Sequence, residues 1–394
     1  MNAQISFLNH EYSLISIPLD LYSQFLQPIL RILLPQTQSL DASARTPEHE
    51  LEGLTSDNQH GFLNISITPL EVSVVAHSSW ARNVLQPVID ALPRHVSRSV
   101  SVVGHGYMVL CVISADLDAA GRVMELTSPL ALAGVPIFFI TTYFSDFILF
   151  PKSERNKVIQ ALSDHGFEPA SNQSSFVQQH HDGRRPSSSS LLSTDAIDTP
   201  PPPHPPPQAS NAAELQARTF DLLQKRSVAP YVDAGLELVQ CSGREPSQLA
   251  KYYHGSRQPA PGHRRQSWIE NVDAKLYTSI ISALVSRPRF LSVTLAQDDP
   301  PSLLLDRTLL PLFGDSIVGD TDYTLVPIFL DLANLPSQVT GIICGVAGRL
   351  VDDLRMTETS QLSYLSTARA GAVILAEEQA TRALAVLGPL LLKP

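Results

Sequence analysis

Few residues of this chain have the types and spacing that catalysis requires. His180, His181 and Asp182 are adjacent and could bind a metal ion, but they lie in a polar segment without a rigid scaffold, where a solvated run is the better interpretation. The carboxylate pairs Asp298–Asp299 and Asp352–Asp353 fall in predicted loops. No nucleophile, base and orienting group come together, and the GxSxG, HExxH and phosphate-loop patterns are absent. We therefore expect no enzyme activity, no metal site and no cofactor.

A helix start near Gly341 offers a different kind of chemistry. Apolar residues recur with a helical period over 339–350, and Ser337 is predicted to cap this helix. The first turn of a helix has unpaired amide groups and the positive end of the helix dipole, which together suit an anion. Gly341 has no side chain to block a close approach, and Ile342 follows it. This helix start could therefore hold a carboxylate.

The elements around this helix occur twice. The earlier copy is predicted to run as strand 108–113, a helix ending at Gly134, strand 135–143, a turn, strand 147–150 and a second helix. The later copy repeats this order over 324–387, and the blocks leading each half also suggest strand, helix, strands. The order is the start of a ferredoxin-like βαββαβ unit. We therefore predict an α+β fold of tandem ferredoxin-like units, four units arranged as two pairs.

Composition marks the boundaries between the predicted units. Ser, Gln and Pro dominate the middle of the chain and cannot bury enough apolar surface to fold, so they predict a disordered linker. The predicted division is 1–92 for the first unit, 93–167 for the second, 168–213 for the linker, 214–322 for the third unit with a polar insert at 242–266, and 323–394 for the fourth.

The two copies differ at their strand–turn–strand segments. Residues 140–162 align with 365–387 without a gap, at an offset of 225 residues. The first copy has Tyr143, Asp146 and Phe147, whereas the second has small residues such as Ala368 and Gly371. The small residues could make room for a ligand or for aromatic side chains of a partner domain. Alternatively, the aromatic residues are ordinary core or interface residues and the aspartate is a turn residue.

Charge and hydropathy exclude several classes of partner. The net charge of −10 argues against nucleic-acid binding, which needs a basic surface. No window is apolar enough to span a membrane and no secretory signal opens the chain, so we expect a cytoplasmic protein. Cys111, Cys241 and Cys344 form no CxxC pair and are expected to be buried free thiols.

The chain resembles the CASTOR family of ACT-domain proteins, cytosolic amino-acid sensors of the TOR nutrient pathway. The residues that carry the resemblance are VPIFFITTYFSDFILFPKSERNKVIQAL at 135–162, VTGIICGVAGRL at 339–350 and YLST at 364–367. The resemblance implies four ACT domains whose halves clasp a free amino acid between the second and fourth domains. It also implies a non-catalytic protein whose partner is a regulatory complex of the TOR pathway.

The resemblance further implies a set of ligand contacts. Gly341 and Ile342 match main-chain donors of the arginine-sensing member, and Thr367 keeps a hydroxyl. Pro136 and Ile137 match a serine and a valine there, so one donor is lost. The places of its acidic residues are taken by three residues without charge: Val339, Ala368 and Gly371. Because a buried guanidinium needs carboxylates, arginine is doubtful and a smaller or apolar amino acid is expected.

Three functional hypotheses remain at this point. The first is a non-catalytic amino-acid sensor that binds a protein partner in a ligand-dependent way. The second is a constitutive ACT-domain interaction scaffold that has lost ligand binding. The third is a detached regulatory subunit of an amino-acid biosynthetic enzyme, which rests on fold analogy. Self-association as a homodimer is left open.

Overall fold

The computed structural model describes residues 3–34, 61–103, 106–114, 119–167, 209, 211–244, 273–296, 299–336, 338–356 and 361–392. His180–Asp182 and nearly all of the predicted linker and polar insert lie outside these ranges.

Twelve strands form a closed antiparallel ring. Its order is β2-β3-β1-β5-β7-β6-β14-β15-β13-β9-β11-β10, and β10 pairs with β2 to complete the circle. The ring strands are β1 (Ala3–Ile17), β2 (Phe62–Ile67), β3 (Val72–His77), β5 (Tyr107–Ser114), β6 (Phe138–Thr141), β7 (Asp146–Pro151), β9 (Leu238–Gly243), β10 (Leu291–Ala296), β11 (Ser302–Asp306), β13 (Leu325–Asp331), β14 (Leu362–Ser366) and β15 (Ala370–Ala376). Three two-residue strands lie beside the ring: β4 (Ser101–Val102), β8 (Pro230–Tyr231) and β12 (Ile317–Val318).

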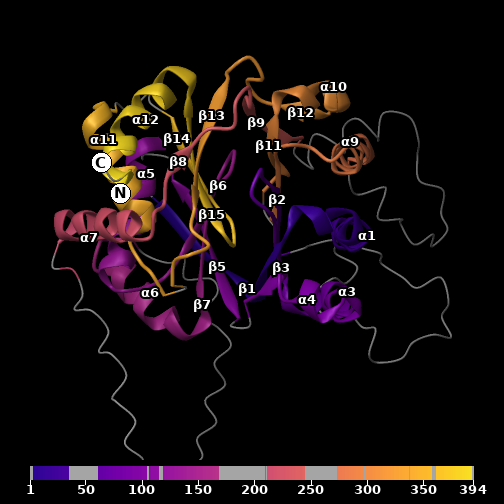
Figure 1. Cartoon of the computed structure of the whole chain (residues 1–394), viewed down its shortest axis with the longest axis horizontal. Helices are drawn as coiled ribbons and strands as arrows, with labels where there is room; N and C mark the ends of the chain where they lie inside the picture. The colour runs from indigo at the N-terminus through magenta and orange to yellow at the C-terminus, as the bar shows by residue number, and fades with distance from the viewer. Residues whose placement is uncertain are drawn as a thin grey trace, which may run out of the picture.

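Helices cover the outside of the ring in two layers (Figure 1). One layer contains α5 (Ala119–Leu132), α6 (Arg155–Ser163), α7 (Ala212–Lys225), α11 (Ile342–Leu354) and α12 (Glu377–Leu391). The other contains α1 (Tyr22–Leu33), α3 (Gln86–Ala91), α4 (Arg94–Ser97), α9 (Ala274–Val285) and α10 (Leu310–Phe313). Shorter helical segments are α2 (Ser78–Trp80), η1 (Leu19–Leu21), η3 (Ala81–Leu85), η4 (Lys152–Glu154), η7 (Arg307–Leu309) and η8 (Gly314–Ser316). No helix in the described ranges is both long enough and apolar enough to cross a bilayer.

The strands separate an inner core from two outer cores. Along β7, Phe147 and Leu149 belong to the inner cluster, whereas Ile148 and Phe150 belong to the outer one, as alternation along a strand requires. The first outer core joins α1 and α3 to α9, and the second joins α5 and α6 to α11 and α12. Segments far apart in the sequence therefore share each outer core.

The strand order supports a ferredoxin-like α+β fold. We call the four predicted units the first segment (1–92), the second (93–167), the third (214–322) and the fourth (323–394). The first and third segments complete the βαββαβ order with very short fourth strands, β4 beside β1 and β12 beside β9. For the other two segments the outer place is taken by strands from elsewhere, residues 3–8 of β1 beside β5 and β8 beside β13. All four predicted units contribute strands to one ring, and their arrangement as two pairs stays a prediction. Their assignment as four ACT units stays a prediction.

Three predicted boundaries differ from the structure. Helix α11 begins at Ile342 with Gly341 as its N-cap, four residues after the cap predicted at Ser337, a residue outside the described ranges, and Val339 lies outside the helix. The last residues assigned to the linker instead open α7, where the Asn211 side chain accepts from the amide of Glu214. Ser242 and Gly243, assigned to the insert, end strand β9. For α7 and β9 local polarity suggested a loop, but helix capping and strand pairing extended the element, whereas α11 begins later than predicted.

Helix α7 packs tightly across α11. A β-carbon on Gly341 would lie 2.7 Å from the Leu215 side chain, and one on Gly345 would lie 2.9 Å from Thr219. The Thr219 hydroxyl also donates to the Gly341 carbonyl at 3.2 Å. Glycine at 341 and 345 therefore allows α7 to approach, and the segment after the predicted linker is bound to the fourth segment.

Replacing Gly345 with alanine should destabilise the protein by about 1–2 kcal/mol, because overpacking against Thr219 outweighs the better helix propensity of alanine. Gly388→Ala in α12, where an added β-carbon meets nothing within 4 Å, should be neutral or stabilising. Urea unfolding measures both. Adding Thr219→Ala to Gly345→Ala should recover more than half of the loss, and a Gly345→Ala variant as stable as wild type would contradict this packing.

Candidate functional site

The second and fourth segments meet where β6 lies beside β14. Only Ile140 and Leu365 form a register pair across this seam. The neighbouring amides of Phe139 and Tyr364 instead donate to the side chains of Ser366 and Thr141, both at 3.0 Å. Side-chain acceptors thus replace ladder carbonyls, and the two strands diverge instead of forming a continuous ladder.

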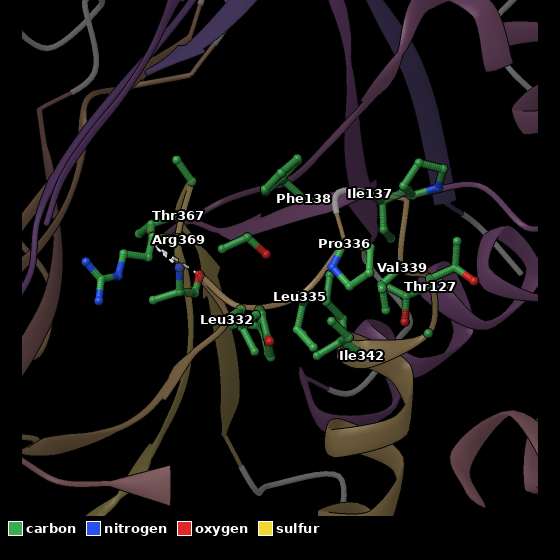
Figure 2. A pocket seen from close by; sticks show the side chains of 18 of the residues that line it. Thr127, Ile137, Phe138, Leu332, Leu335, Pro336, Val339, Ile342, Thr367 and Arg369 are labelled. Atoms are coloured by element: carbon green, nitrogen blue, oxygen red, sulfur yellow. Dashed lines mark hydrogen bonds between the residues drawn. The ribbon is translucent and has the colours of Figure 1, made fainter. Parts of the chain in front are cut away.

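A cavity of about 230 Å³ lies at this seam (Figure 2). Its walls come from α5, from the start of β6, from the loop between β13 and α11, from the first turn of α11, and from the hairpin of β14 and β15. Apolar side chains on these walls are Ile137, Phe138, Leu332, Leu335, Val339 and Ile342. Because typical drug-sized pockets are roughly 300–1,000 Å³, the cavity suits a small metabolite.

Tyr364 lies at the wall of this cavity, but its hydroxyl is buried beside Gly371, which does not line the cavity. The residue is 1% exposed, and its hydroxyl has no hydrogen-bond partner among the residues that the structure describes. Burial raises the pKa of this phenol above its ordinary value, so the group keeps its proton. A buried hydroxyl without a partner costs free energy, which makes this position an exception that calls for an explanation.

The first turn of α11 faces the same cavity. Gly341 has the left-handed φ of +86°, which glycine adopts at low cost, and no side chain caps the helix. The main-chain N–H groups of the first turn, from Ile342 to Cys344, therefore have no capping side chain as a hydrogen-bond acceptor. Gly341 was predicted to leave room for a ligand, but the space beside it is filled by Leu215, so its first role is in helix packing.

Six of the seven residues predicted to contact a ligand line this cavity: Pro136, Ile137, Gly341, Ile342, Thr367 and Ala368. Gly371 does not line it. An added β-carbon there would overlap the hydroxyl of Tyr364, so the small residue makes room for an aromatic side chain of its own hairpin. That these residues bind a ligand stays a prediction.

Among the residues that the structure describes, no negative side chain lines the cavity. Its lining residues in the described ranges include neither Asp nor Glu, and their single charged side chain is Arg369. The Arg369 guanidinium donates to both carboxylate oxygens of Asp331, at 3.2 and 2.7 Å, and points away from Leu335 and Ile342 (Figure 2). This pairing lowers the pKa of Asp331. The cavity therefore offers donors and apolar surface but no carboxylate for a cation.

Glu71 holds one wall of the cavity from the opposite side of the ring. One of its oxygens accepts from the Thr367 hydroxyl and from the Arg369 amide, both at 2.6 Å, and the other accepts from Ser16. Ser73 accepts from the Ala368 amide at 3.1 Å. Burial raises the pKa of the 1% exposed Glu71 carboxyl, and these hydrogen bonds act against the rise.

Glu71 was not predicted from the sequence, although a repeated turn gave a signal. Thr367, Thr142 and Thr68 each accept from the amide three residues ahead, and each donates to the carbonyl of that same residue. The third copy of this turn, at Thr68, was not aligned with the other two. Glu71 is the last residue of the turn that begins at Thr68, and its carboxylate reaches the hairpin of β14 and β15 in the fourth segment.

Tyr143, Asp146 and Phe147 have three different environments. Tyr143 is 38% exposed, and its amide donates to Ser302 of β11. Phe147 is buried in the inner core, with its ring centroid 4.8 Å from that of Phe62. Asp146 is not a turn residue but the first residue of β7, fully buried, with Oδ2 2.5 Å from Nε of Arg122. At the equivalent place, Gly371 accommodates the Tyr364 hydroxyl instead of an ion pair.

Cysteines and metal ligands add no second site in the described part of the chain. All three cysteines are buried and form no disulfide within the described residues, and burial raises the pKa of Cys344, at the cavity, to about 11. Such a thiol is a poor nucleophile at neutral pH. Among the described residues no group of three His, Cys, Asp or Glu is placed to hold a metal ion.

Comparison with known proteins identifies one domain. Residues 102–164 match the model of the ACT domain, so an ACT domain is present there, spanning β5 to α6. ACT domains are regulatory and not catalytic. No curated protein matches the chain.

Several solved structures are similar to parts of this chain. A protein of Agobacterium tumefaciens is 19% identical over 43% of this chain and 93% of its own, with a TM-score of 0.26. Aspartate kinase from Synechocystis is 11% identical over 98% of this chain and 55% of its own, with a TM-score of 0.31. A putative C-terminal regulatory domain of aspartate kinase from Porphyromonas gingivalis is 13% identical over 42% and 96%, with a TM-score of 0.24. With TM-scores below 0.5, these likenesses add nothing to the ACT match.

Replacing Glu71 with alanine should cost about 2–4 kcal/mol of unfolding free energy, because the Arg369 amide and the Thr367 hydroxyl lose a shared buried acceptor. Glu71→Gln keeps one acceptor oxygen and should cost less than half as much. Chemical denaturation compares the two. Equal losses in both variants would show that the oxygen shared by the two donors does not hold this wall.

Stability should depend on the ionisation of Asp146. Burial raises its pKa from 3.8 to about 6, with the Arg122 charge opposing the rise, so the folded state holds this proton more tightly than the unfolded chain. The contribution is full below about pH 4 and is lost as the pH rises toward 6. Relative to Asp146→Asn, wild type should therefore lose on the order of 3 kcal/mol across that window. A difference between the two proteins that stays constant from pH 4 to 7 would contradict this.

Proposed function

We propose that this protein is a non-catalytic regulatory protein that binds a small amino acid in the cavity between its second and fourth segments. The observation that carries the proposal is the convergence of an uncapped helix start and apolar side chains on one cavity at the seam. The ACT domain at residues 102–164 supports it, because ACT domains commonly bind amino acids.

The chemistry of the cavity favours an amino acid with an uncharged side chain. A ligand carboxylate would meet the amide groups at the start of α11, where the helix dipole adds favourable charge. The ligand side chain would lie against Ile137, Leu335 and Val339. Arginine and lysine are disfavoured, since a desolvated cation would have no carboxylate partner among the lining residues.

Regulation would follow from the place of the ligand between two segments. A molecule that contacts both sides of the seam stabilises their closed arrangement by its differential affinity, and a partner that reads this arrangement would respond. The resemblance to CASTOR proteins leads to a more specific proposal. In it, the protein senses an amino acid in the cytoplasm and acts on a regulatory complex of the TOR pathway.

A ligand-independent scaffold is the alternative that one observation favours. Leu215 and Thr219 of α7 already fill the space beside Gly341 and Gly345, so the outer side of the seam is held together without a ligand. A regulatory subunit of a biosynthetic enzyme would use the same fold and has no further observation in its favour.

Titration calorimetry of the full chain against the twenty amino acids tests the proposal. Amino acids with small or apolar side chains should bind, and arginine and lysine should not. Val339→Phe should reduce that binding at least tenfold by filling the cavity. Val285→Phe, the same change at a side chain that is 55% exposed on α9, should leave it unchanged.

Absence of heat and of thermal shift with every amino acid would remove the sensing function and favour the scaffold. Binding that Val339→Phe leaves intact would place the ligand elsewhere in the molecule.

A further inference from the structure

Helix α7 packs on residues that line the cavity, although none of its own residues, all of them described, belongs to the lining. Gly341 and Cys344, at the start of α11, and Ala131 of α5 do line it. Leu215 of α7 is 7% exposed and shares a small buried cluster with Ala131 and Cys344, and its side chain also fills the space beside Gly341. A single layer of residues therefore separates α7 from the cavity.

The contact with α7 fixes the residue at which α11 begins. The Gly341 carbonyl accepts from the Thr219 hydroxyl at 3.2 Å as well as from the Gly345 amide at 2.8 Å. No side chain caps this helix, and an uncapped helix end frays readily. Because Leu215 and Thr219 hold the N-cap residue, they also hold the direction of the amide groups that follow it, which are the groups proposed to bind a carboxylate.

The two halves of α7 are anchored differently. Leu223, in the C-terminal half, is fully buried in the second outer core, which joins α5 and α6 to α11 and α12. Leu215, in the N-terminal half, belongs instead to the small cluster with Ala131 and Cys344, and the helix begins with exposed residues at 212–213. Parts of a protein with fewer buried apolar contacts open at a lower free energy. The N-terminal half is therefore the part of α7 whose docking responds to a change at the cavity wall.

We infer that Leu215 and Thr219 are positioning residues for the ligand site, and that occupancy of the cavity and docking of the N-terminal half of α7 stabilise each other. The inference rests on the proposed function, because it concerns the same helix start. A ligand carboxylate caps the first turn of α11 through its amides, and α7 holds the same turn through the Gly341 carbonyl. Since coupling between two binding events is reciprocal, the ligand tightens α7, and docked α7 raises the affinity for the ligand.

Titration calorimetry of full-length variants with alanine, valine and leucine tests the positioning role. Leu215→Ala should weaken the binding of these probes about tenfold, and Thr219→Val, which keeps the shape of the side chain but removes the donor to Gly341, about threefold. Leu276→Ala, at a 1% exposed leucine of α9 in the first outer core, should lower the melting temperature but leave the affinity unchanged.

Wild-type affinity in both α7 variants, or an equal loss in Leu276→Ala, would overturn this inference and leave the proposed function standing. Absence of binding by all three amino acids to the wild-type protein would overturn both.

Hydrogen exchange followed by mass spectrometry tests the reciprocal effect on α7. In the wild-type full chain, a saturating concentration of whichever of these amino acids binds should slow amide exchange in residues 212–219 about threefold or more, because opening of this half becomes costlier. Exchange in α9 should not change, since its residues pack in the first outer core. Slower exchange at the start of α11 without any change in 212–219 would contradict the coupling.

Discussion

The closure of the ring at β6 and β14 is the constraint on which the candidate site depends. Every strand must have two neighbours for the ring to close, yet these two strands share only the pair of Ile140 and Leu365. Hydroxyl groups of Thr141 and Ser366 take over the acceptor role that a longer ladder would supply. Divergence at this seam leaves space between α5 and α11, and that space is the cavity. An uncapped helix start is tolerated at this cavity, as is typical of functional sites.

Contacts from distant parts of the chain hold the seam in this form. Helix α7 packs on the glycines of α11 from outside, and Glu71 of the first segment binds the hairpin of the fourth from across the ring. Both contacts are buried, so each carries free energy that the seam strands do not supply by themselves. The shape of the cavity is therefore a property of the whole ring, and a change at Glu71 or Thr219 reaches the site without touching a ligand.

Local patterns in the sequence predicted the elements better than the contacts between them. Alternating and 3.6-residue apolar patterns located β5, β13 and α11, and the ferredoxin-like order followed from them. The helix start was misplaced at Ser337, since a polar residue resembles a cap while a left-handed glycine gives no polar signal. Glu71 could not be connected to Thr367, 296 residues away, because burial of a carboxylate is a tertiary property. The unpaired state of Tyr364 is likewise visible only in three dimensions.

The amide groups at the start of α11 are the most direct reporters of the central claim, that this seam holds a small carboxylate. Backbone NMR of the isotopically labelled full chain, titrated with leucine and with valine, follows each of them separately. We predict that the largest and saturable shifts fall on Ile342, Ile343 and Cys344, with smaller ones on Thr367 and Ala368 across the cavity. Shifts confined to another part of the ring, such as α9 and β10, or no saturable shift at any concentration, would contradict it.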